Sequence, residues 1–588
     1  MLVKNPRQFQ VRTRQFIAST YVRGTSALPT YAEWLSDHLL ARAHDYPIPL
    51  NPIRFSILTT VYEKTDVNFL RETAKSIFAQ TLPFHEWMIL AHGSVSDGVD
   101  KLLRDVERRP NVRVHRLPQN LGIMGGMRFC LERASGDYIV PMDADDLLTE
   151  DALQIMAAAI AWAENPAILY SDEDILMDGA LTTPYLRPDW DPILNLANSY
   201  IWHLCVFRRD TAIELEVYTD MGSNWCHDWD TIFRLANAGY IPLHIPEVLY
   251  HWRHHAASST NRADPESGSL KSTRHLLERQ IALQPNPEHY EVEAFPIFRG
   301  TQEWHIKRRP YDGRAMDIIL VARNIERALG TVRSILRNTN YPFGSVIVCI
   351  NEEPNDRLRT QFEMCIEDAF SNKSVTSGKT SIQFVADKGL GGVKVAVSKA
   401  TSPLTLFCTD AIEVKDENWS WEALKLIEFH HDIAMIGGRL LVGNIIVDGG
   451  GVFGERGLPV CLDKGLSADA IGPFALSLKP HTVNAVPLDF FVARHEFLTS
   501  AINSLPDAAS ISCLSMWLGG VAVEQKSRVA FTPLINVSVK GDILGTTCKN
   551  NKNELEHEAF LLQYGHMIKK QQWSSSRFAM YKEIYQSC

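Results

Sequence analysis

Residues 141–153 read PMDADDLLTEDAL, and three aspartates, Asp143, Asp145 and Asp146, fall within four consecutive positions. The letters before them, DYIV, are apolar and predict a short buried strand, while those after them, TEDALQIMAAAIAWAENP, predict a helix. In open α/β sheets, ligands bind at the carboxyl ends of strands. An Asp-x-Asp pair at such an end suits a hard divalent cation that bridges the protein to a diphosphate. Asp146 has a simpler interpretation, as a cap of the helix that follows.

The sequence around these acids alternates between strand-like and helix-like segments. From Phe55 the chain reads FSILTTVY, then FLRETAKSIFAQT, then EWMILAHGS, which we interpret as strand, helix and strand. This alternation predicts an α/β fold in which a parallel or mixed sheet is flanked by helices.

The same pattern occurs a second time, about 260 residues further on. SIFAQTLPF is followed in the second half by SILRNTNYPF, NLGIMGG by DKGLGGV, and ERASGDYIVPMDADD by SKATSPLTLFCTDAI. This period is too long for a solenoid repeat. Because the matches keep their order and spacing, we predict two tandem copies of one α/β domain.

Breaks in the pattern divide the chain into five expected segments. These are a helical leader over 1–52, a first α/β domain over 53–262, a connecting segment with a helix over 263–314, a second α/β domain over 315–545, and a helical tail over 546–588.

Composition and charge exclude several kinds of partner. The formal net charge is −10, from 59 basic and 69 acidic residues, and no basic stripe is present, so nucleic acid is not expected as a partner. No apolar run reaches about 18 residues, and the first residues lack the apolar centre of a signal peptide. We therefore expect a cytoplasmic protein, with peripheral contact to a membrane left open.

Four motifs, in order, resemble those of the family 2 glycosyltransferases with the GT-A fold. They are FSILTTVYEKTDVNFLRETAKSIFAQT, NLGIMGGMRFCLERASGDYIVPMDADDLL, CHDWDTIFRLANAGY and IPEVLYHW. The first copy is most similar to tandem bacterial enzymes that build O-antigens and other surface polysaccharides, and the second copy shows a weaker resemblance. The resemblance implies a nucleoside-diphosphate sugar as donor, a glycan or lipid-linked glycan as acceptor, and Mn²⁺ or Mg²⁺ as cofactor.

The resemblance also implies roles for individual residues. Nucleotide-sugar contacts fall on Thr60, Tyr62, Arg128, Asp143 and Asp145. The metal would be held by Asp143 and Asp145, with His251 completing its site, and Asp228 of CHDWD would be the catalytic base. One base without a covalent nucleophile implies a single displacement with inversion.

Each of these residues also has an interpretation without a catalytic role. Asp228 and Asp230 both fall in the first turn of an expected helix, where acids favour the helix dipole. His251 could be a hydrogen-bonded core histidine. His203, between apolar residues, fits a core histidine better than a donor contact, and His254 and His255 are expected to be solvated.

For the acceptor we expect contacts from Asp172, Glu173 and Asp230, although YSDED also fits a simple charged turn.

The chain departs from the family pattern in two places. LAHGS stands where the family has acids in a DDGS-like motif, so the donor base stays open and His92 could stack on the base or donate to it. In the second copy, Thr409 and Ala411 replace the two metal acids, only Asp410 remains between them, and residues 510–523 contain no acid. We therefore expect the second copy to be inactive.

Three other interpretations fit parts of the sequence. GGGVFG, at 449–454, fits a dinucleotide-binding pattern but is followed by ERGLPVCLDKG instead of a helix, so a glycine-rich strand and loop is expected. A sugar-nucleotide pyrophosphorylase would need a glycine-rich, arginine-containing loop after the first strand, and LTTVYEKT lacks it. A glycan-binding or scaffold protein with two inactive copies is the remaining alternative to the enzyme.

Overall fold

The computed structural model describes most of the chain after the expected leader. The described residues are 42, 46–51, 53–255, 268–297, 303–310, 313–351, 355–371, 380–454, 457–544 and 554–570. Nearly all of the predicted helical leader, and the predicted tail apart from 554–570, lie outside these residues.

The first domain is built on a nine-stranded mixed sheet with the order β3-β2-β1-β4-β8-β6-β9-β5, in which β7 also pairs with β6. Its strands are β1 (Phe55–Val61), β2 (Glu86–His92), β3 (Val112–Leu117), β4 (Tyr138–Pro141), β5 (Leu147–Leu148), β6 (Ile168–Met177), β7 (Ala180–Tyr185), β8 (Cys205–Arg208) and β9 (Leu243–His254). The first four strands run parallel, and β8 runs antiparallel to both β4 and β6. The carboxyl ends of β1 and β4 therefore lie side by side.

Helices cover both faces of this sheet. They are α3 (Val67–Phe78), α4 (Asp97–Val106), α5 (Gly122–Arg133), α6 (Ala152–Trp162), α7 (Pro192–Ala197), α8 (Arg209–Glu214) and α9 (His227–Asn237). Successive residues of a strand face opposite sides. Accordingly Ile57 packs in the cluster that holds α3, α4 and α6, while Leu58 packs in the cluster that holds α5, α8 and α9. Both strand faces are buried, which explains the continuous apolar runs in the sequence.

The second domain repeats this strand order in a ten-stranded sheet, β14-β13-β12-β15-β22-β17-β23-β16, in which β18 pairs with β17 as β7 does with β6, and the additional strand β21 pairs with β23. Its strands are β12 (Met316–Val321), β13 (Phe343–Cys349), β14 (Ser381–Val385), β15 (Leu404–Thr409), β16 (Ile412–Val414), β17 (Ile433–Val442), β18 (Ile445–Asp448), β21 (His481–Val483), β22 (Phe490–Arg494) and β23 (Arg528–Val539). Its helices are α11 (Ile325–Asn338), α12 (Asp356–Ser371), α13 (Leu390–Lys399), α14 (Trp419–Phe429), α15 (His495–Ser504) and α16 (Leu514–Glu524). The predicted fold, two tandem GT-A-like α/β copies with mixed sheets, is confirmed.

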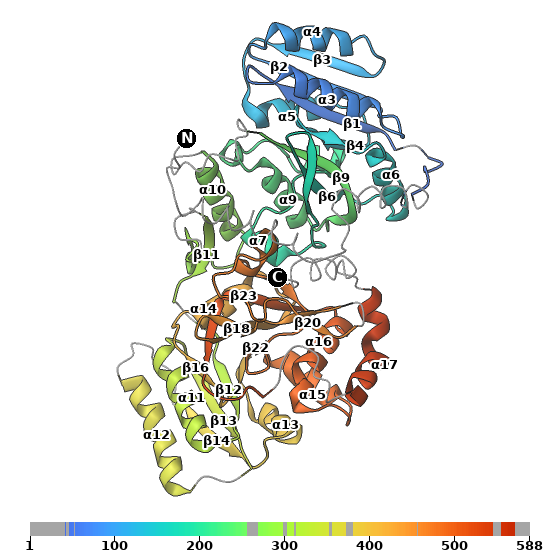
Figure 1. The fold of residues 1–588 in the computed structure, drawn as a ribbon. Coiled ribbons are helices and arrows are strands. Elements are labelled where there is room, and N and C mark those ends of the chain that lie inside the picture. Colours follow the sequence, from blue (N-terminus) through green and yellow to red (C-terminus); the bar gives the residue numbers. More distant parts are fainter. Residues whose placement is uncertain are drawn as a thin grey trace.

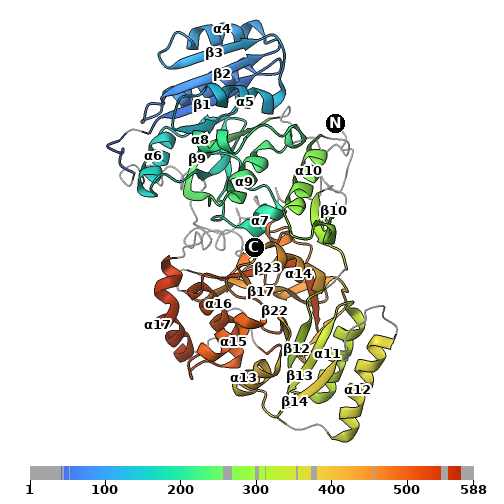
Figure 2. The same cartoon turned by 180° about the vertical axis from the view of Figure 1, so that it is seen from behind.

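Smaller elements connect and flank the two domains (Figures 1 and 2). Helix α10 (Gly268–Ala282) and the antiparallel hairpin of β10 (Tyr290–Ala294) and β11 (Trp304–Arg308) lie at the side of the junction. Helix α17 (Glu554–Lys570) packs on α16, where Phe560 and Tyr564 surround Trp517. The glycine-rich stretch forms β19 (Gly451–Phe453), paired with β20 (Pro459–Cys461), as predicted. Over the part of the chain that the structure describes, every helix is too short or too polar to cross a bilayer.

Candidate active site

The three aspartates that follow β4 separate into two exposed residues and one buried residue. The side chains of Asp143 and Asp145 are 55% and 38% exposed, whereas Asp146 is 1% exposed. The Asp146 carboxylate accepts hydrogen bonds from the Tyr250 hydroxyl and the Arg253 backbone N–H, both at 2.7 Å. Its interpretation as a helix cap is therefore wrong, because Asp146 ties the acidic loop to β9.

His203 approaches Asp143 from the segment before β8. Its Nε2 lies 3.7 Å from Oδ2 of Asp143, its Nδ1 lies 3.5 Å from Oε2 of Glu173, and its ring stacks on Tyr250 at 4.6 Å. Burial alone would lower the pKa of His203, but the contact with Glu173 and the charge of Asp143 raise that pKa to about 10. The preference for a core histidine over a donor contact stays a prediction: the His203 side chain is 20% exposed and is held by Glu173 and Tyr250, while its Nε2 also reaches the exposed Asp143.

His255 is the histidine that reaches Asp145. Its Nε2 lies 3.0 Å from Oδ2 of Asp145, and the Asp145 carbonyl accepts a hydrogen bond from Nε of Arg253 at 2.6 Å. His251, to which the metal was assigned, instead places its Nδ1 2.6 Å from Oδ1 of Asp174. The expectation that His255 is solvated is wrong, because His255, and not His251, contacts Asp145.

The donor atoms at this strand end fit a hard divalent cation. Asp143, Asp146 and His203 form a group, found within the described residues, whose ligand atoms lie within 4.8 Å of one another. Both Asp146 oxygens already accept hydrogen bonds, and His203 contacts Glu173 as well as Asp143, so Asp143 is the exposed carboxylate of this group. The carboxylates of Asp143 and Asp145 are oxygen donors of the kind that Mg²⁺ and Mn²⁺ accept, and the imidazole of His255 lies beside Asp145.

Asp228 faces these acids from the first turn of α9. Desolvation by the walls of the site, followed by the charges of Asp145 and Asp228, raises the pKa of Asp143, and His203 opposes this shift. The Asp228 side chain is 34% exposed and its Oδ1 lies 3.3 Å from Nε2 of His227. The charges of Asp145 and Asp228 thus both act on Asp143, and a cation bound beside these acids would relieve their repulsion.

Asp230, two residues further along α9, is buried and forms ion pairs. It accepts a hydrogen bond from Nε of Arg234 at 2.7 Å and forms a second ion pair with Arg279. The Asp230 side chain is only 1% exposed, so its expected contact with an acceptor is wrong. It fixes α9 to α10.

Asp172 and Glu173 are buried as well, in the strand β6. Asp172 accepts from the Arg187 backbone N–H at 2.8 Å and lies 2.9 Å from Nε2 of His244. Glu173 pairs with Arg187 at 2.9 Å and, on its other side, with His203. The prediction that they line the acceptor site is wrong, and Glu173 acts on His203 instead.

Thr60 and Tyr62, which we expect to contact the nucleotide, differ in how far their side chains are exposed. Tyr62, after β1, is 41% exposed, and burial followed by the charge of Asp145 raises its pKa, which places it beside the acids. Thr60 lies under α5, because a Cβ at Gly126 would come within 2.9 Å of its methyl group. Tyr62 is thus the more exposed of the two, while Thr60 is half-buried.

His92 and Arg128 have structural partners instead. His92 is 3% exposed, and its Nδ1 accepts a hydrogen bond from the Leu121 backbone N–H at 3.1 Å. Arg128 pairs with Glu132 at 2.7 Å and donates to the Val217 carbonyl at 3.1 Å. The expected stacking of His92 on a base is therefore wrong, and the contacts of Arg128 brace α5 without supporting its assignment to the diphosphate.

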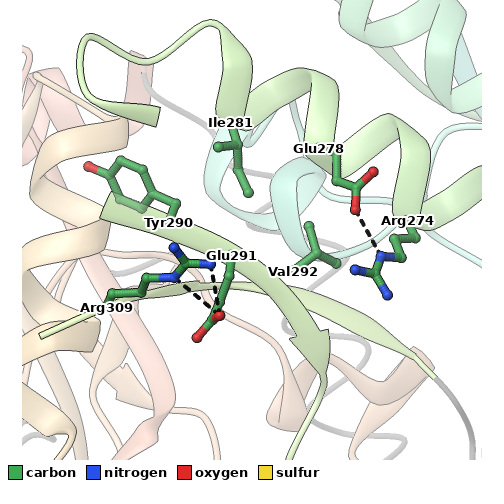
Figure 3. Close-up of a pocket in the computed structure, with 7 residues that line it drawn as sticks. All are labelled: Arg274, Glu278, Ile281, Tyr290, Glu291, Val292 and Arg309. Atoms are coloured by element: carbon green, nitrogen blue, oxygen red, sulfur yellow. Dashed lines mark hydrogen bonds and ion pairs between the residues drawn. The ribbon is translucent and has the colours of Figure 1, made fainter. Parts of the chain in front are cut away.

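A pocket of about 270 Å³ lies away from these acids, between α10 and the β10–β11 hairpin (Figure 3). Its charged residues pair with each other, Arg274 with Glu278 at 2.8 Å and Arg309 with Glu291 at 3.1 Å. The pocket shares no residue with the strand-end site, so the chemistry concentrates at the carboxyl ends of β1 and β4.

Comparison with known proteins identifies the first domain. Residues 56–210 match the family described as Glycosyl transferase family 2. The first domain is a family 2 glycosyltransferase domain. Its matched range begins within β1, contains the acids that follow β4, and ends in α8.

Two relatives and one solved structure illustrate the similarity. The chain is 25% identical over 411 residues to the O-antigen biosynthesis protein RfbC of Myxococcus xanthus, covering 68% of this chain and 30% of that protein. It is 23% identical over 238 residues to the amylovoran biosynthesis glycosyltransferase AmsE of Erwinia amylovora, covering 39% of this chain and 86% of that one. S. aureus TarS in complex with UDP-GlcNAc aligns with a TM-score of 0.33 at 17% identity, covering 39% and 67% of the two chains. The chain spans less than half the length of the first curated relatives it matches, 30% and 44%.

Proposed function

We propose that the first domain is a metal-dependent inverting glycosyltransferase that moves a sugar from a nucleoside-diphosphate sugar to a growing glycan. The observation that carries this proposal is the pair of exposed acids, Asp143 and Asp145, at the carboxyl end of β4 in a family 2 domain, where the charge of Asp228 from the first turn of α9 also acts on Asp143. Binding at strand ends is the rule for open α/β sheets.

The assignment of roles follows from exposure and partners. Asp143, Asp145 and His255 would hold Mn²⁺ or Mg²⁺, which when bound neutralises the charge that develops on the departing diphosphate. Asp228 is the partly exposed carboxylate opposite them, so it would accept the proton of the acceptor hydroxyl. A single base on the acceptor side leads to one displacement and inversion at the anomeric carbon.

His203 would keep the acidic end of β4 in a fixed arrangement. Glu173, which is itself paired with Arg187, lies beside Nδ1 of His203, and Tyr250 stacks on the His203 ring. Its Nε2 lies 3.7 Å from Oδ2 of Asp143, and the contact with Glu173 and the charge of Asp143 raise its pKa. The pair therefore orients Asp143 toward the position of the metal.

The substrate class is inferred from the relatives. RfbC is named for O-antigen biosynthesis and AmsE for amylovoran biosynthesis, which supports a surface polysaccharide, free or linked to a lipid, as the acceptor. The buried His92 leaves the identity of the donor base open to a screen.

The second domain would be inactive. Thr409 pairs with Val321 across β12 and β15, and by sequence spacing it takes the place of Asp143, which follows β4 in the first sheet. Asp410 turns inward, where it accepts from the backbone N–H groups of Arg323 and Asn324 and lies 3.2 Å from Arg327. Arg323 and Arg327 thus occupy the space beside Asp410 in which a metal would have to bind. A single buried carboxylate also holds a divalent ion poorly.

A donor screen tests the proposal. The purified chain is incubated with nucleotide sugars and Mn²⁺, and release of nucleoside diphosphate is measured with and without a chelator. Metal-dependent release from at least one donor, lost in Asp228→Asn when an acceptor is present, is the expected result. Binding of glycans without release from any donor would favour the scaffold protein instead.

A further inference from the structure

The short helix α7 joins the two domains. It lies at their junction in both views (Figures 1 and 2). Ile193 of α7 is 1% exposed and belongs to the hydrophobic cluster of the second domain that contains α11, α12 and α14. An element of the catalytic domain is thus anchored in the core of the inactive one.

Asp191 fixes the start of α7 to the second domain. Its carboxylate accepts hydrogen bonds from the Ile193 N–H at 2.9 Å, from the Thr482 N–H at 2.7 Å and from the Thr482 hydroxyl at 2.9 Å. Asp191 is 1% exposed and Thr482, on β21, is 7% exposed. Buried carboxylates depend strongly on such donors, because they have lost their hydration.

From α7, one line of contacts leads to the proposed base. The carbonyl of Asn195, in α7, accepts a hydrogen bond from Nε1 of Trp229 at 2.8 Å. Trp229 is 5% exposed and follows Asp228 directly in α9. The position of α7 therefore constrains the first turn of α9, where Asp228 lies.

A second line leads to His203. The Asp191 N–H donates to the Tyr200 hydroxyl at 2.9 Å, and the Tyr200 carbonyl accepts from Nε of Arg187 at 2.7 Å. Arg187 in turn pairs with Glu173, which lies beside His203. Both lines start at the contact between Asp191 and Thr482.

We propose that Thr482 is a positioning residue, through which the second domain sets the geometry of the catalytic site in the first. This inference rests on the proposed function, in which Asp228 is the catalytic base and His203 orients Asp143. It assigns the degenerate copy a role in catalysis without a ligand of its own. Small displacements of a reacting group are costly, since about 1 Å can lower a rate about 10²-fold.

Three single substitutions in the full chain test the inference. Thr482→Val keeps the shape and the backbone donor but removes the hydroxyl, whereas Thr482→Ser restores it. Thr532→Val is the matched control, because Thr532 is a buried threonine of the same domain whose hydroxyl donates to Glu422 at 3.0 Å, within that domain.

We expect Thr482→Val to lower kcat for transfer about tenfold, with binding of nucleoside diphosphate and Mn²⁺ unchanged by calorimetry. Thr482→Ser should recover kcat to within a factor of about three, and Thr532→Val should leave kcat unchanged. Hydrogen exchange should speed up in α7 and α9 of Thr482→Val alone. If Thr482→Val does not fold, Asp191→Asn replaces it, with the same expectations.

Equal kcat and equal exchange in Thr482→Val and the wild type would overturn the inference, as would an equal loss in Thr532→Val. The failure of the proposed function looks different. If the wild type transfers no sugar, that function is wrong, while the exchange of α7 and α9 still decides whether Thr482 couples the two domains.

Discussion

Oδ2 of Asp145 lies 3.0 Å from Nε2 of His255, although the two residues are 110 positions apart in the chain. Asp145 follows β4, and His255 follows β9, which pairs with β5 at the edge of the sheet. Two separate segments thus supply one carboxylate and one imidazole to the same point. The carboxylate is a ligand that suits Mg²⁺ or Mn²⁺, and the imidazole places a nitrogen donor next to it.

Metal-dependent donor binding should depend on both members of this pair. Asp145→Ala removes an anionic ligand and His255→Ala removes its neighbour, so calorimetric binding of nucleoside diphosphate with Mn²⁺ should weaken in each. The double variant should lose less than the sum, because the two residues contact each other. His251→Ala is the control, since His251 contacts Asp174 instead. Unchanged binding in Asp145→Ala, or an effect of His251→Ala as large as that of His255→Ala, would contradict the assignment.

Asp228 and Asp230 should respond differently to the same chemical change. Asp228→Asn keeps the shape but removes the proton acceptor, so turnover should fall by roughly 10²–10⁴ with donor binding kept. Asp230→Asn weakens the buried pairs with Arg234 and Arg279 and should lower the melting temperature instead. Single-turnover transfer and thermal unfolding separate the two effects. Turnover of Asp228→Asn within a factor of a few of the wild type would assign the base elsewhere.

The sequence predicts the sheets well, because their signal is local. Every residue of FSILTTV except Thr60 is buried, and the apolar run alone indicates a strand covered on both faces. The repeat of this pattern predicts the second copy. Strand order inside each sheet depends on contacts between distant segments, so it could only come from the structure.

Only those site residues that belong to a local sequence motif could be predicted. Asp143 and Asp145 follow the strand β4 and Asp228 begins the helix α9, so each could be recognised from its own motif. The partners of His203, His251 and His255 depend on the register between β6 and β9, which shifts at Ser171/Asp172 and again at Asp172/Glu173. Because such bulges change which side chains face the site, sequence spacing could not choose among the histidines.

Stability should fall in mild acid because of His305. Burial, followed by the charges of Lys425 and Lys307, lowers the pKa of this 6% exposed histidine from 6.5 to about 2. The unfolded chain binds a proton below about pH 6.5 while the folded chain does not. The contribution of His305 is therefore fully present above about pH 6.5 and is lost as the pH falls from there toward 2.

Urea unfolding at pH 7, 6 and 5 measures this effect. Well below pH 6.5 the wild type should lose about 1.4 kcal/mol per pH unit more than His305→Leu. His431→Leu, which replaces an exposed histidine, should follow the wild type. Parallel curves for the wild type and His305→Leu would show that His305 takes up its proton in the folded chain.

Substitution of Asp410 should separate stability from catalysis. Asp410 is 2% exposed and accepts hydrogen bonds from the N–H groups of Arg323, at 3.1 Å, and Asn324, at 2.8 Å. Asp410→Ala would leave these donors and Arg327 without their acceptor, so the second domain should lose about 1–3 kcal/mol, more than a surface change costs. Asp410→Asn keeps one acceptor oxygen and should lose less.

Sugar transfer by the folded protein should be unaffected, because Asp410 belongs to the sheet that lacks the metal acids and the base. Transfer is measured well below the unfolding temperature, and circular dichroism confirms that each variant is folded. Equal kcat in the wild type and Asp410→Ala is the expected outcome. If folded Asp410→Ala transfers no sugar while Asp410→Asn does, the carboxyl end of β15 forms a second catalytic site, and the chain carries two activities.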